Sequence, residues 1–423
     1  MITDLFTFWN SVGAFIALTW LVRFMILGNA ARRRKVLRPT SYEVLPPKLP
    51  SVSMLVAAKD EEDNIEQCVT TLLAQDYPDL EIIVIDDRST DRTPAILRRL
   101  ESGAGGKLRV ITITKLREGW FGKNNAMRAG VEASTGDWLC FTDADCRQTS
   151  NRTISIAVGE ALRRDVDLLS ITPVLETKTA WERIIQPACA ALLIAWFRPS
   201  RVNSSKTRTA YANGAFMLTR RSCYDAIGGH ERVRTEVNED IQMARHVKDA
   251  GLRLRVVEND GLYVTRMYAT PREAWRGWSR IFYGSFRTMG RLALPALSVL
   301  LSTLVPATMF VVSLVWLIRS PADTVGAQWS TFLVYSLTIA LLQLTMWRFY
   351  GIVQIARGWS ATYVLGAFVV FAMLVNAMLK TLGTTTQWRG TTYRRDALVP
   401  DRDKTAREPS IAAEPDRGAT GNV

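Results

Sequence analysis

The chain contains 423 residues, 48% of them hydrophobic, and carries a formal net charge of +13. That length accommodates a catalytic domain and a membrane part in one chain. Five cysteines, an odd number without paired metal-ligand spacing, indicate neither a disulfide framework nor a zinc site. The positive charge suits nucleic acid or an anionic membrane. Because basic runs lie directly beside apolar segments, we expect a lipid bilayer as partner and no nucleic acid.

The first predicted element is a transmembrane anchor within residues 1–30. Residues 5–27 are apolar enough to span a bilayer, and four basic residues follow soon after. We therefore expect an uncleaved anchor with its N-terminus outside the cell. Arg23 lies near the inner end, where a long side chain can reach the interface. A proline-rich linker at residues 42–50 leads to the next domain.

From residue 51 to residue 268, short β-branched runs alternate with amphipathic stretches. Strands are expected at residues 53–57, 81–85 and 108–112, and helices at residues 65–74 and 93–100. This alternation predicts an α/β domain with a Rossmann-like, mostly parallel sheet, in which ligands bind at the carboxyl ends of the strands.

The C-terminal third is predicted to contact the membrane. Residues 269–291 interleave aromatic and arginine side chains at helical spacing, which indicates an interfacial amphipathic helix or a helix packed on the catalytic domain. Transmembrane helices are expected within residues 292–380, and residues 381–423 form a polar tail expected to be disordered. The three apolar stretches are residues 292–318, 330–350 and 359–379.

These spans do not give a consistent topology. Three further spans after a cytoplasmic domain place the basic segment at residues 380–395 outside, against the positive-inside tendency. One stretch is therefore not expected to be a simple span, and the longest, with Pro306 in its middle, could form a re-entrant hairpin. The chain is expected to be an integral protein of the cell (inner) membrane with a cytoplasmic catalytic domain.

Two pairs of carboxylates follow apolar strands. Asp86 and Asp87 emerge where a parallel strand delivers ligand-binding groups, although strand-end or N-cap roles are the alternative. Asp143 and Asp145 are one residue apart, so alternation places both on one side of an extended segment. They are predicted to bind Mg²⁺ or Mn²⁺ together with a diphosphate, since these ions prefer hard oxygen ligands. A D-x-D triplet alone is also common on exposed loops.

These motifs, in this order, resemble the family 2 glycosyltransferases. The resemblance is to a membrane-bound branch that glycosylates lipids and includes carotenoid- and hopanoid-associated and ceramide glucosyltransferases. It rests on the segments 57–62, 75–78, 86–91, 119–124, 141–145, 213–214, 228–230, 237–240, 275–280 and 388–393. It implies a GT-A catalytic domain and an inverting, metal-dependent transfer of a sugar from a nucleotide sugar. Within the family, a UDP-sugar is the donor that the resemblance favours.

The resemblance also implies roles for single residues. Those expected to bind the nucleotide sugar are Ala58, Glu61, Asp86, Asp87, Lys123, Asp143 and Gly214. Asp240 is the expected catalytic base, with Glu239 assisting, because an acceptor hydroxyl must lose its proton as the new bond forms. The alternative for Asp240 is a carboxylate that opens a helix.

Three further residues are expected near the acceptor or the diphosphate. These are His230, Trp278 and Arg280. His230 lies beside two glycines, and a turn histidine that only bonds its neighbours is an equal alternative. Arg280 suits a diphosphate or a lipid headgroup.

The expected acceptor is the hydroxyl of a membrane lipid, because an interfacial aromatic helix lets an amphiphile enter from the side. The alternatives are a polyprenyl-phosphate glycosyltransferase, a polysaccharide synthase, and a non-catalytic membrane scaffold or transporter. The synthase is disfavoured, since Trp275 to Arg280 replace the Gln-x-x-Arg-Trp segment of those enzymes. The scaffold is disfavoured because the three carboxylate sites are present.

Overall fold

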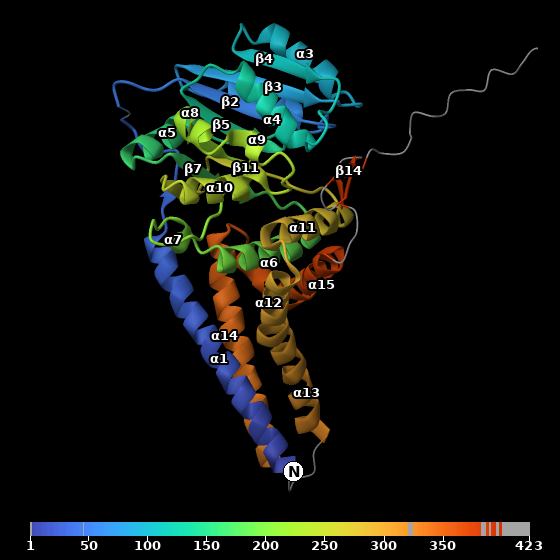
Figure 1. The fold of residues 1–423 in the computed structure, drawn as a ribbon. Coiled ribbons are helices and arrows are strands. Elements are labelled where there is room, and N and C mark those ends of the chain that lie inside the picture. Colours follow the sequence, from blue (N-terminus) through green and yellow to red (C-terminus); the bar gives the residue numbers. More distant parts are fainter. Residues whose placement is uncertain are drawn as a thin grey trace, which may run out of the picture.

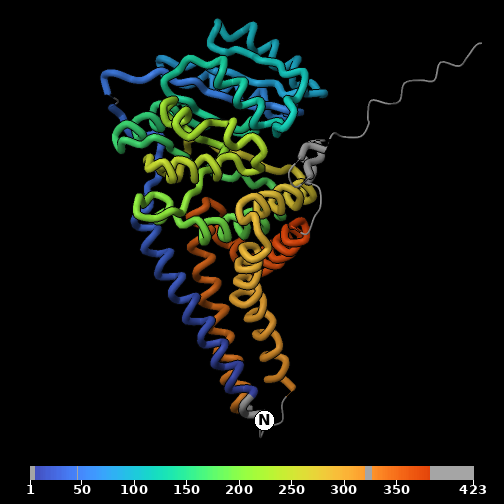
Figure 2. The backbone as a smooth tube through the Cα atoms, in the orientation of Figure 1, coloured from blue at the N-terminus to red at the C-terminus, as the bar shows by residue number. Residues whose placement is uncertain are grey.

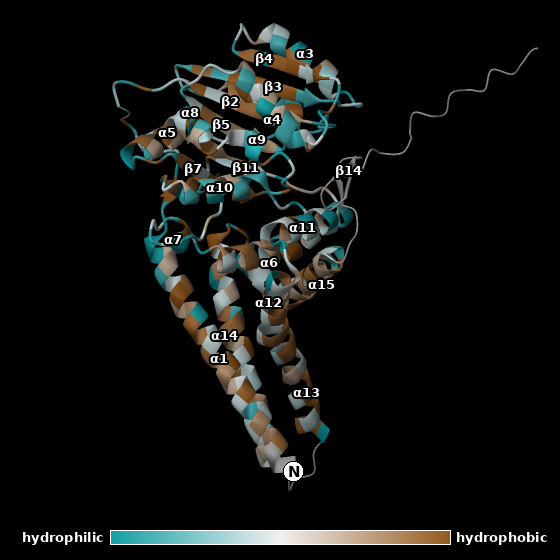
Figure 3. Cartoon of the chain, in the orientation of Figure 1, coloured by the Kyte–Doolittle hydropathy of each residue, from teal (hydrophilic) through white to brown (hydrophobic). Residues whose placement is uncertain are grey.

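A computed structural model describes residues 2–44, 46–319 and 325–381, and the backbone of residues 386–388, 391–394 and 397–399. Figure 1 shows an α/β domain at one end of a group of long helices. Figure 3 shows that these helices are predominantly hydrophobic along their length. Most of the predicted tail, residues 381–423, lies outside the described residues.

The α/β domain is built on a mostly parallel sheet of eight strands in the order β1-β10-β7-β9-β5-β2-β3-β4. Only β9 runs antiparallel to its neighbours, β5 and β7. The strands are β1 (Val36–Leu37), β2 (Val52–Ala58), β3 (Leu80–Asp87), β4 (Leu108–Ile113), β5 (Trp138–Asp143), β7 (Leu168–Thr172), β9 (Met217–Arg220) and β10 (Leu254–Asn259). The expected fold class is confirmed.

Helices flank this sheet, and a small sheet lies beside it in the order β6-β11-β8. The helices are α2 (Ile65–Leu73), α3 (Thr93–Gly103), α4 (Gly122–Ala133), α5 (Thr153–Arg163), α8 (Arg221–Ala226), α9 (Gly229–Arg232) and α10 (Glu239–Asp249). The small sheet comprises β6 (Cys146–Gln148), β8 (Val174–Leu175) and β11 (Tyr263–Thr265). A third sheet comprises β12 (Thr386–Trp388), β13 (Thr391–Arg394) and β14 (Ala397–Val399).

The central strands send alternate side chains to two hydrophobic cores, as the pleat of a strand dictates. Met54 and Val56 of β2 face one core, whereas Leu55 faces the other. The core that holds Leu55 continues without a break to Trp20, in the first membrane helix. The α/β domain and the membrane helices therefore share one hydrophobic core.

Four helical segments are long and apolar enough to cross a membrane, judged by length and composition. They are Leu5–Arg33, Met289–Arg319, Gly326–Ile352 and Arg357–Thr381. The corresponding elements are α1 (Ile2–Arg33), α12 (Met289–Val299) with η1 (Leu300–Leu304) and α13 (Val305–Arg319), α14 (Val325–Ile352), and η2 (Arg357–Thr362) with α15 (Tyr363–Thr381). In Figure 1, α1, α13 and α14 run away from the α/β domain together.

The expected re-entrant hairpin around Pro306 is not formed. Residues 289–319 form one uninterrupted helical segment with a π-helical turn at Leu300–Leu304, where the Val305 N–H donates to the Leu300 carbonyl. Proline lacks the N–H that would donate to the Ser302 carbonyl in a regular α-helix. The indole Nε1 of Trp20 donates to that carbonyl instead, at 2.7 Å. The lost helical bond is replaced by a bond between helices, so the chain need not fold back.

α15 has a different orientation. It crosses the end of the bundle next to the α/β domain, beside α11 (Pro271–Phe286) and α6 (Ala180–Trp196), as the backbone trace also shows (Figures 1 and 2). It packs on α6, α11 and α12. Three helices thus run the length of the bundle, and the fourth lies across its end, which removes the conflict in the predicted topology.

The predicted amphipathic helix at residues 269–291 is divided in two. Thr270 and Glu273 form a capping box at the start of α11. Arg287, in the left-handed conformation with φ 64°, ends it, and Thr288 caps α12. Trp278 is buried, as in a helix packed on the catalytic domain, whereas Trp275 is 37% exposed, and a position in the membrane interface stays a prediction.

Candidate active site

The order of the strands reverses at β2: β3 pairs with it on one side, and β5, which comes later in the sequence, pairs with it on the other. Ligands of open α/β sheets bind at the carboxyl ends of the strands beside such a switch point. The register pairs Ala58 with Asp86 and Ala57 with Asp143. Residues from three separate predicted motifs are therefore adjacent at one edge of the sheet.

The loops that follow β2 and β3 are joined by polar contacts. Asp60, with φ 53°, accepts a hydrogen bond from the Thr90 N–H at 2.7 Å, and the Glu61 N–H donates to Thr93 Oγ1 at 2.8 Å. Asn64 Nδ2 donates to Glu61 Oε2 at 3.0 Å. These bonds hold Glu61 at the edge of a cavity rather than in free solvent.

Asp86 and Asp87 lie in different surroundings despite being neighbours. Asp87 lines the cavity and forms a two-point ion pair with Arg88, at 2.8 and 2.9 Å. Asp86 is buried, does not line the cavity, and accepts the Ser89 N–H at 3.2 Å. Of this pair, the structure presents Asp87 to a ligand and uses Asp86 to shape the turn.

Lys123 connects two of the predicted motifs. Its Nζ lies 2.7 Å from Asp143 Oδ1 and 2.8 Å from Glu239 Oε1. Burial acts to lower the pKa of Lys123, but the two carboxylates outweigh it and hold that pKa well above its usual value. Lys123 therefore stays charged and keeps the carboxylates of β5 and α10 together.

Asp240 lies in the first turn of α10 with its carboxyl at the cavity wall. The Gly214 N–H donates to its Oδ2 at 2.8 Å, and the Ile241 N–H donates to its Oδ1 at 2.7 Å. Burial and the neighbouring Glu239 raise the pKa of Asp240 to about 7, against the opposing effects of Lys123 and the two N–H donors. A carboxyl with such a pKa can accept a proton and release it near neutral pH.

Gly214 permits the close approach of these groups. A Cβ at this position would lie 3.2 Å from Lys123 Nζ and 3.4 Å from Asp240 Oδ2. A side chain here would displace one of the two charged groups.

Asp143 and Asp145 lie at the end of β5 and in the turn to β6, and both line the cavity. Carboxylate oxygens are the donors that Mg²⁺ and Mn²⁺ prefer, so the pair fits such an ion chemically. Within the described residues, no group of three or more Asp, Glu, His or Cys side chains could hold a metal ion. An ion at this position would therefore need oxygens from a ligand to complete its shell.

His230 does not lie where the sequence analysis expected it. It is buried and absent from the cavity wall, with Nδ1 at 2.9 Å from the Tyr224 hydroxyl and its ring packed edge-on against Phe141. Burial lowers the pKa of His230 to about 3, so it is neutral. Sequence adjacency to two glycines suggested a pocket, but the left-handed turn at Gly228 and Gly229 directs the ring into the core.

The cavity has a volume of about 1690 Å³ and extends from the switch point into the membrane helices. One end is polar and contains Glu61, Asp87, Lys123, Asp143 and Asp240. The other end is lined by side chains of α1, α12, α14 and α15, among them Leu27, Val299, Phe349 and Val370. The carboxylate cluster and the apolar region are parts of one continuous space.

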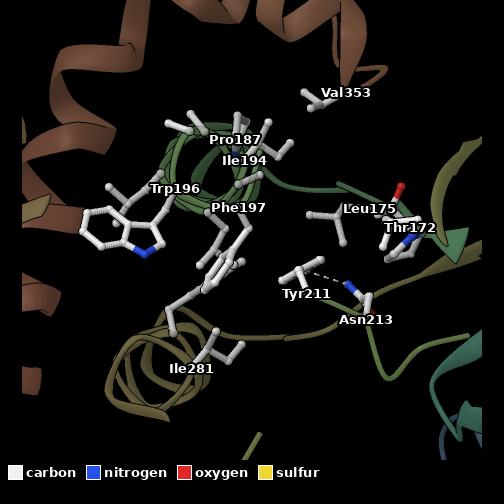
Figure 4. A pocket seen from close by; sticks show the side chains of 18 of the residues that line it. Thr172, Leu175, Pro187, Ile194, Trp196, Phe197, Tyr211, Asn213, Ile281 and Val353 are labelled. Atoms are coloured by element: carbon white, nitrogen blue, oxygen red, sulfur yellow. Dashed lines mark hydrogen bonds between the residues drawn. The ribbon is translucent and has the colours of Figure 1, made fainter. Parts of the chain in front are cut away.

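The middle of the cavity lies between α6 and α11, as Figure 4 shows with Ile194 and Phe197 on one side and Ile281 on the other. Phe197 stacks on Tyr211, whose hydroxyl lies 3.5 Å from Asn213 Nδ2. The sequence analysis missed α6, although Thr179 and Glu182 form a capping box that marks its start.

Trp278 and Arg280 both line the cavity, and their predicted contact with an acceptor or a diphosphate stays a prediction. Trp278 is buried, and its Nε1 donates to Gln186 Oε1 of α6 at 2.8 Å. This bond ties α11 to α6 and fixes the width of the cavity between them.

The mostly parallel sheet, its switch point and the carboxylates at that edge define an α/β domain with a candidate ligand site at the carboxyl ends of its strands. Residues 53–228 match the protein family described as Glycosyl transferase family 2. This part of the α/β domain is therefore similar to that family, and the sheet agrees with the GT-A class expected from the sequence.

Curated relatives match a similar part of the chain. A 4,4'-diaponeurosporenoate glycosyltransferase of Staphylococcus haemolyticus is 25% identical over 232 residues, which are 54% of this chain and 60% of that protein. A beta-monoglucosyldiacylglycerol synthase of Nostoc sp. is 28% identical over 249 residues, 56% of this chain and 52% of that protein. The chain thus spans between half and two thirds of these relatives.

Among solved structures, the mannosyltransferase PcManGT from Pyrobaculum calidifontis, in complex with GDP-Man and Mn²⁺, is similar with a TM-score of 0.49 at 18% identity. The match covers 88% of this chain and 99% of that one.

Proposed function

We propose that this chain is an inverting, metal-dependent glycosyltransferase that moves a sugar from a nucleotide sugar to the hydroxyl of a membrane lipid. The observation that carries the proposal is the single cavity that joins the carboxylate cluster to apolar walls contributed by the membrane helices. A water-soluble donor can occupy the first part, and an acyl or isoprenoid chain can occupy the second. The names of the two curated relatives, each a glycosyltransferase or synthase of a lipid-like product, support the acceptor class.

In this proposal, Glu61 and Asp87 contact the nucleoside, and Lys123 supports the diphosphate. Asp240 takes the proton of the acceptor hydroxyl as its oxygen forms a bond to the anomeric carbon and the bond to the diphosphate breaks. A single displacement of this kind inverts the anomeric centre. Gly214 keeps the Asp240 carboxyl oriented through its N–H.

Asp143 and Asp145 would hold Mg²⁺ or Mn²⁺. When bound, the ion supplies positive charge that stabilises the departing nucleoside diphosphate. The structure gives Asp143 a cationic partner already, because Lys123 Nζ contacts it.

We further propose that the chain is an integral protein of the cell (inner) membrane with its α/β domain on the cytoplasmic side. Arg32, Arg33, Arg34 and Lys35 stand at the end of α1 that adjoins this domain, which agrees with the positive-inside tendency.

The test is release of nucleoside diphosphate by the detergent-purified full chain, supplied with a panel of nucleotide sugars, membrane lipid extract and Mn²⁺. We expect one donor to be consumed and a glycolipid to appear, with activity reduced by roughly two orders of magnitude or more in Asp240→Asn. Asp145→Ala should lose the response to Mn²⁺. Asp249→Asn, at the opposite end of α10, is the matched control and should keep full activity.

The outcomes separate the alternatives. Full activity in Asp240→Asn would refute the base and favour a polyprenyl-phosphate acceptor, whose oxygen is already ionised. If no donor binds or reacts, the catalytic proposal fails and a scaffold role takes precedence.

A further inference from the structure

Arg23 places a guanidinium in the membrane-helix part of the cavity. It lies ten residues before Arg33, about 15 Å along α1 from the end that adjoins the α/β domain. Its Nη1 donates to Ser302 Oγ at 2.9 Å, its Nη2 approaches Ser298 Oγ at 3.3 Å, and its guanidinium carbon lies 4.7 Å from the Trp20 ring centroid. All of these partners are neutral.

The membrane helices provide no carboxylate for this charge. The sequence contains no Asp or Glu in residues 5–33, 289–319, 325–352 or 357–381. Among the described residues, no ion pair is formed by Arg23 with any acidic side chain of the α/β domain. A guanidinium among apolar helices is costly unless an anion accompanies it, and such residues usually mark a functional site.

A second unpaired cation lines the same cavity. Arg198 caps the short helix α7 (Pro199–Val202), and within the described residues its side chain has neither a hydrogen bond nor an ion pair. Arg23 and Arg198 therefore both line the cavity. The electrostatic energy of two positive charges that face one cavity becomes favourable when an anion binds between them.

The polar groups around Arg23 arise from the irregular helix described above. The π-helical turn at Leu300–Leu304 and the helical bond lost at Pro306 bring Ser302 to Trp20 and Arg23. Thr303 and Tyr363 also line this part of the cavity. A π-turn that gathers hydrogen-bonding side chains inside apolar helices is typical of a binding site.

We propose that Arg23, with Arg198, binds the oxyanion of a membrane lipid, a carboxylate or a phosphate, whose chain occupies the apolar part of the cavity. Arginine presents several donors in a fixed plane, which matches either oxyanion. The inference deepens the proposed function, because it gives the lipid site a charge preference, but the binding site itself does not require that a sugar be transferred.

The experiment measures binding without any sugar donor. The full chain in neutral maltoside micelles is titrated with three ligands that share one tail, namely oleic acid, oleyl phosphate and oleyl alcohol. We expect the wild type to bind at least one of the two anions roughly tenfold more tightly than the alcohol, as a charged hydrogen bond predicts. The anion preferred identifies carboxylate or phosphate as the group recognised.

The variants test the residues. Arg23→Gln removes the charge and leaves a shorter side chain with a single neutral amide group, and it should reduce the preference for the anion to about one. Arg23→Lys should retain part of it, and Arg198→Gln should weaken it. Arg348→Gln is the matched control, because Arg348 is a guanidinium of α14 that packs on Phe24 outside the cavity.

Equal binding of acid, phosphate and alcohol by the wild type overturns the proposal. An unchanged preference for the anion over the alcohol in folded Arg23→Gln also overturns it. If that variant does not fold, an unchanged preference in Arg198→Gln overturns the proposal instead. Addition of the donor afterwards tests the acceptor class separately, since sugar transfer to the oxyanion of oleic acid or oleyl phosphate would make that group the acceptor in place of a hydroxyl. Loss of transfer alone would count against the proposed function and leave the anion site standing.

Discussion

Asp240 holds its proton more tightly than an ordinary aspartate, because its carboxyl is buried and lies beside Glu239. With a pKa of about 7, it is protonated in acid and ionised above neutrality, so only the higher pH range provides a base. We expect kcat/KM to rise about tenfold per pH unit up to about pH 7 and then to level off.

The measurement is a pH–rate profile with a saturating donor. Asp240→Asn should abolish the rise of kcat/KM with pH and most of the activity. Asp249→Asn should keep the pH dependence and the activity of the wild type. A rate independent of pH between 5 and about 7 would contradict the assignment of Asp240 as the base.

His230 provides a test between a pocket role and a packing role. Its contacts are the Tyr224 hydroxyl and the Phe141 ring, both away from the cavity. We expect His230→Leu to lower the free energy of unfolding by roughly 1–3 kcal/mol, because the buried Tyr224 hydroxyl loses its bond to the imidazole and keeps only the bond that it accepts from the backbone N–H of residue 230. The KM values for donor and acceptor should not change.

Tyr224→Phe removes the bond to the imidazole from the other side, together with the bond that the hydroxyl accepts from the His230 N–H, and serves as the control. Thermal unfolding should show that the double variant loses less than the sum of the two single losses. A raised KM in His230→Leu at unchanged stability would restore the pocket role.

The carboxylates at the ends of β3 and β5 could be predicted from the sequence, because each pair follows an apolar strand, whereas Asp240, which opens α10, was assigned from the family resemblance. The orientation of His230 could not, since two glycines leave the direction of the next side chain undetermined. The different positions of Asp86 and Asp87 could not be predicted either, because only the fold shows that Asp87 faces the cavity and that Asp86 bonds within the turn.

At the scale of elements, the bond from Trp20 to the Ser302 carbonyl links α1 to α12 and α13. We expect Trp20→Phe to destabilise the detergent-solubilised chain by about 0.5–1.5 kcal/mol. The bond exists because Pro306 provides no N–H. In a Pro306→Ala background, that carbonyl regains a helical donor, and the cost of Trp20→Phe should fall.

A double-variant cycle of thermal unfolding measures this coupling. Equal costs of Trp20→Phe in both backgrounds would show that the proline is irrelevant to the contact.

The strands and helices of residues 52–113 could be predicted to within three residues, since their hydrophobic period matches their structure. The orientation of α15 could not, because a helix that lies across a bundle end has the same composition as one that spans. α6 was not predicted from the sequence, because Pro187 interrupts its helical pattern of hydrophobic residues.

At the scale of the whole molecule, α15 decides which side of the membrane the chain ends on. Because it lies across the bundle end, we expect Lys380 and the α/β domain to share one side of the membrane and the start of α14 to lie on the other. We expect Lys380→Cys and Ser102→Cys to react with an impermeant thiol reagent from the same side, and Gly326→Cys from the opposite side.

The five native cysteines are buried and provide a low background in this experiment. Labelling of Lys380→Cys together with Gly326→Cys would show that α15 spans the bilayer after all.

The partnership of the first helix with α14 has a consequence for biosynthesis. The Tyr335 hydroxyl donates to the Trp9 carbonyl, and the Thr338 hydroxyl donates to the Gly13 carbonyl, across more than three hundred residues of sequence. α1 is made first, yet its main neighbour is among the last helices to be made. It must therefore remain in the lipid without that neighbour while the α/β domain is synthesised, and the shared core closes only near the end of translation. A ribosome that stops before α14 leaves an orphaned helix for the membrane quality-control machinery to remove.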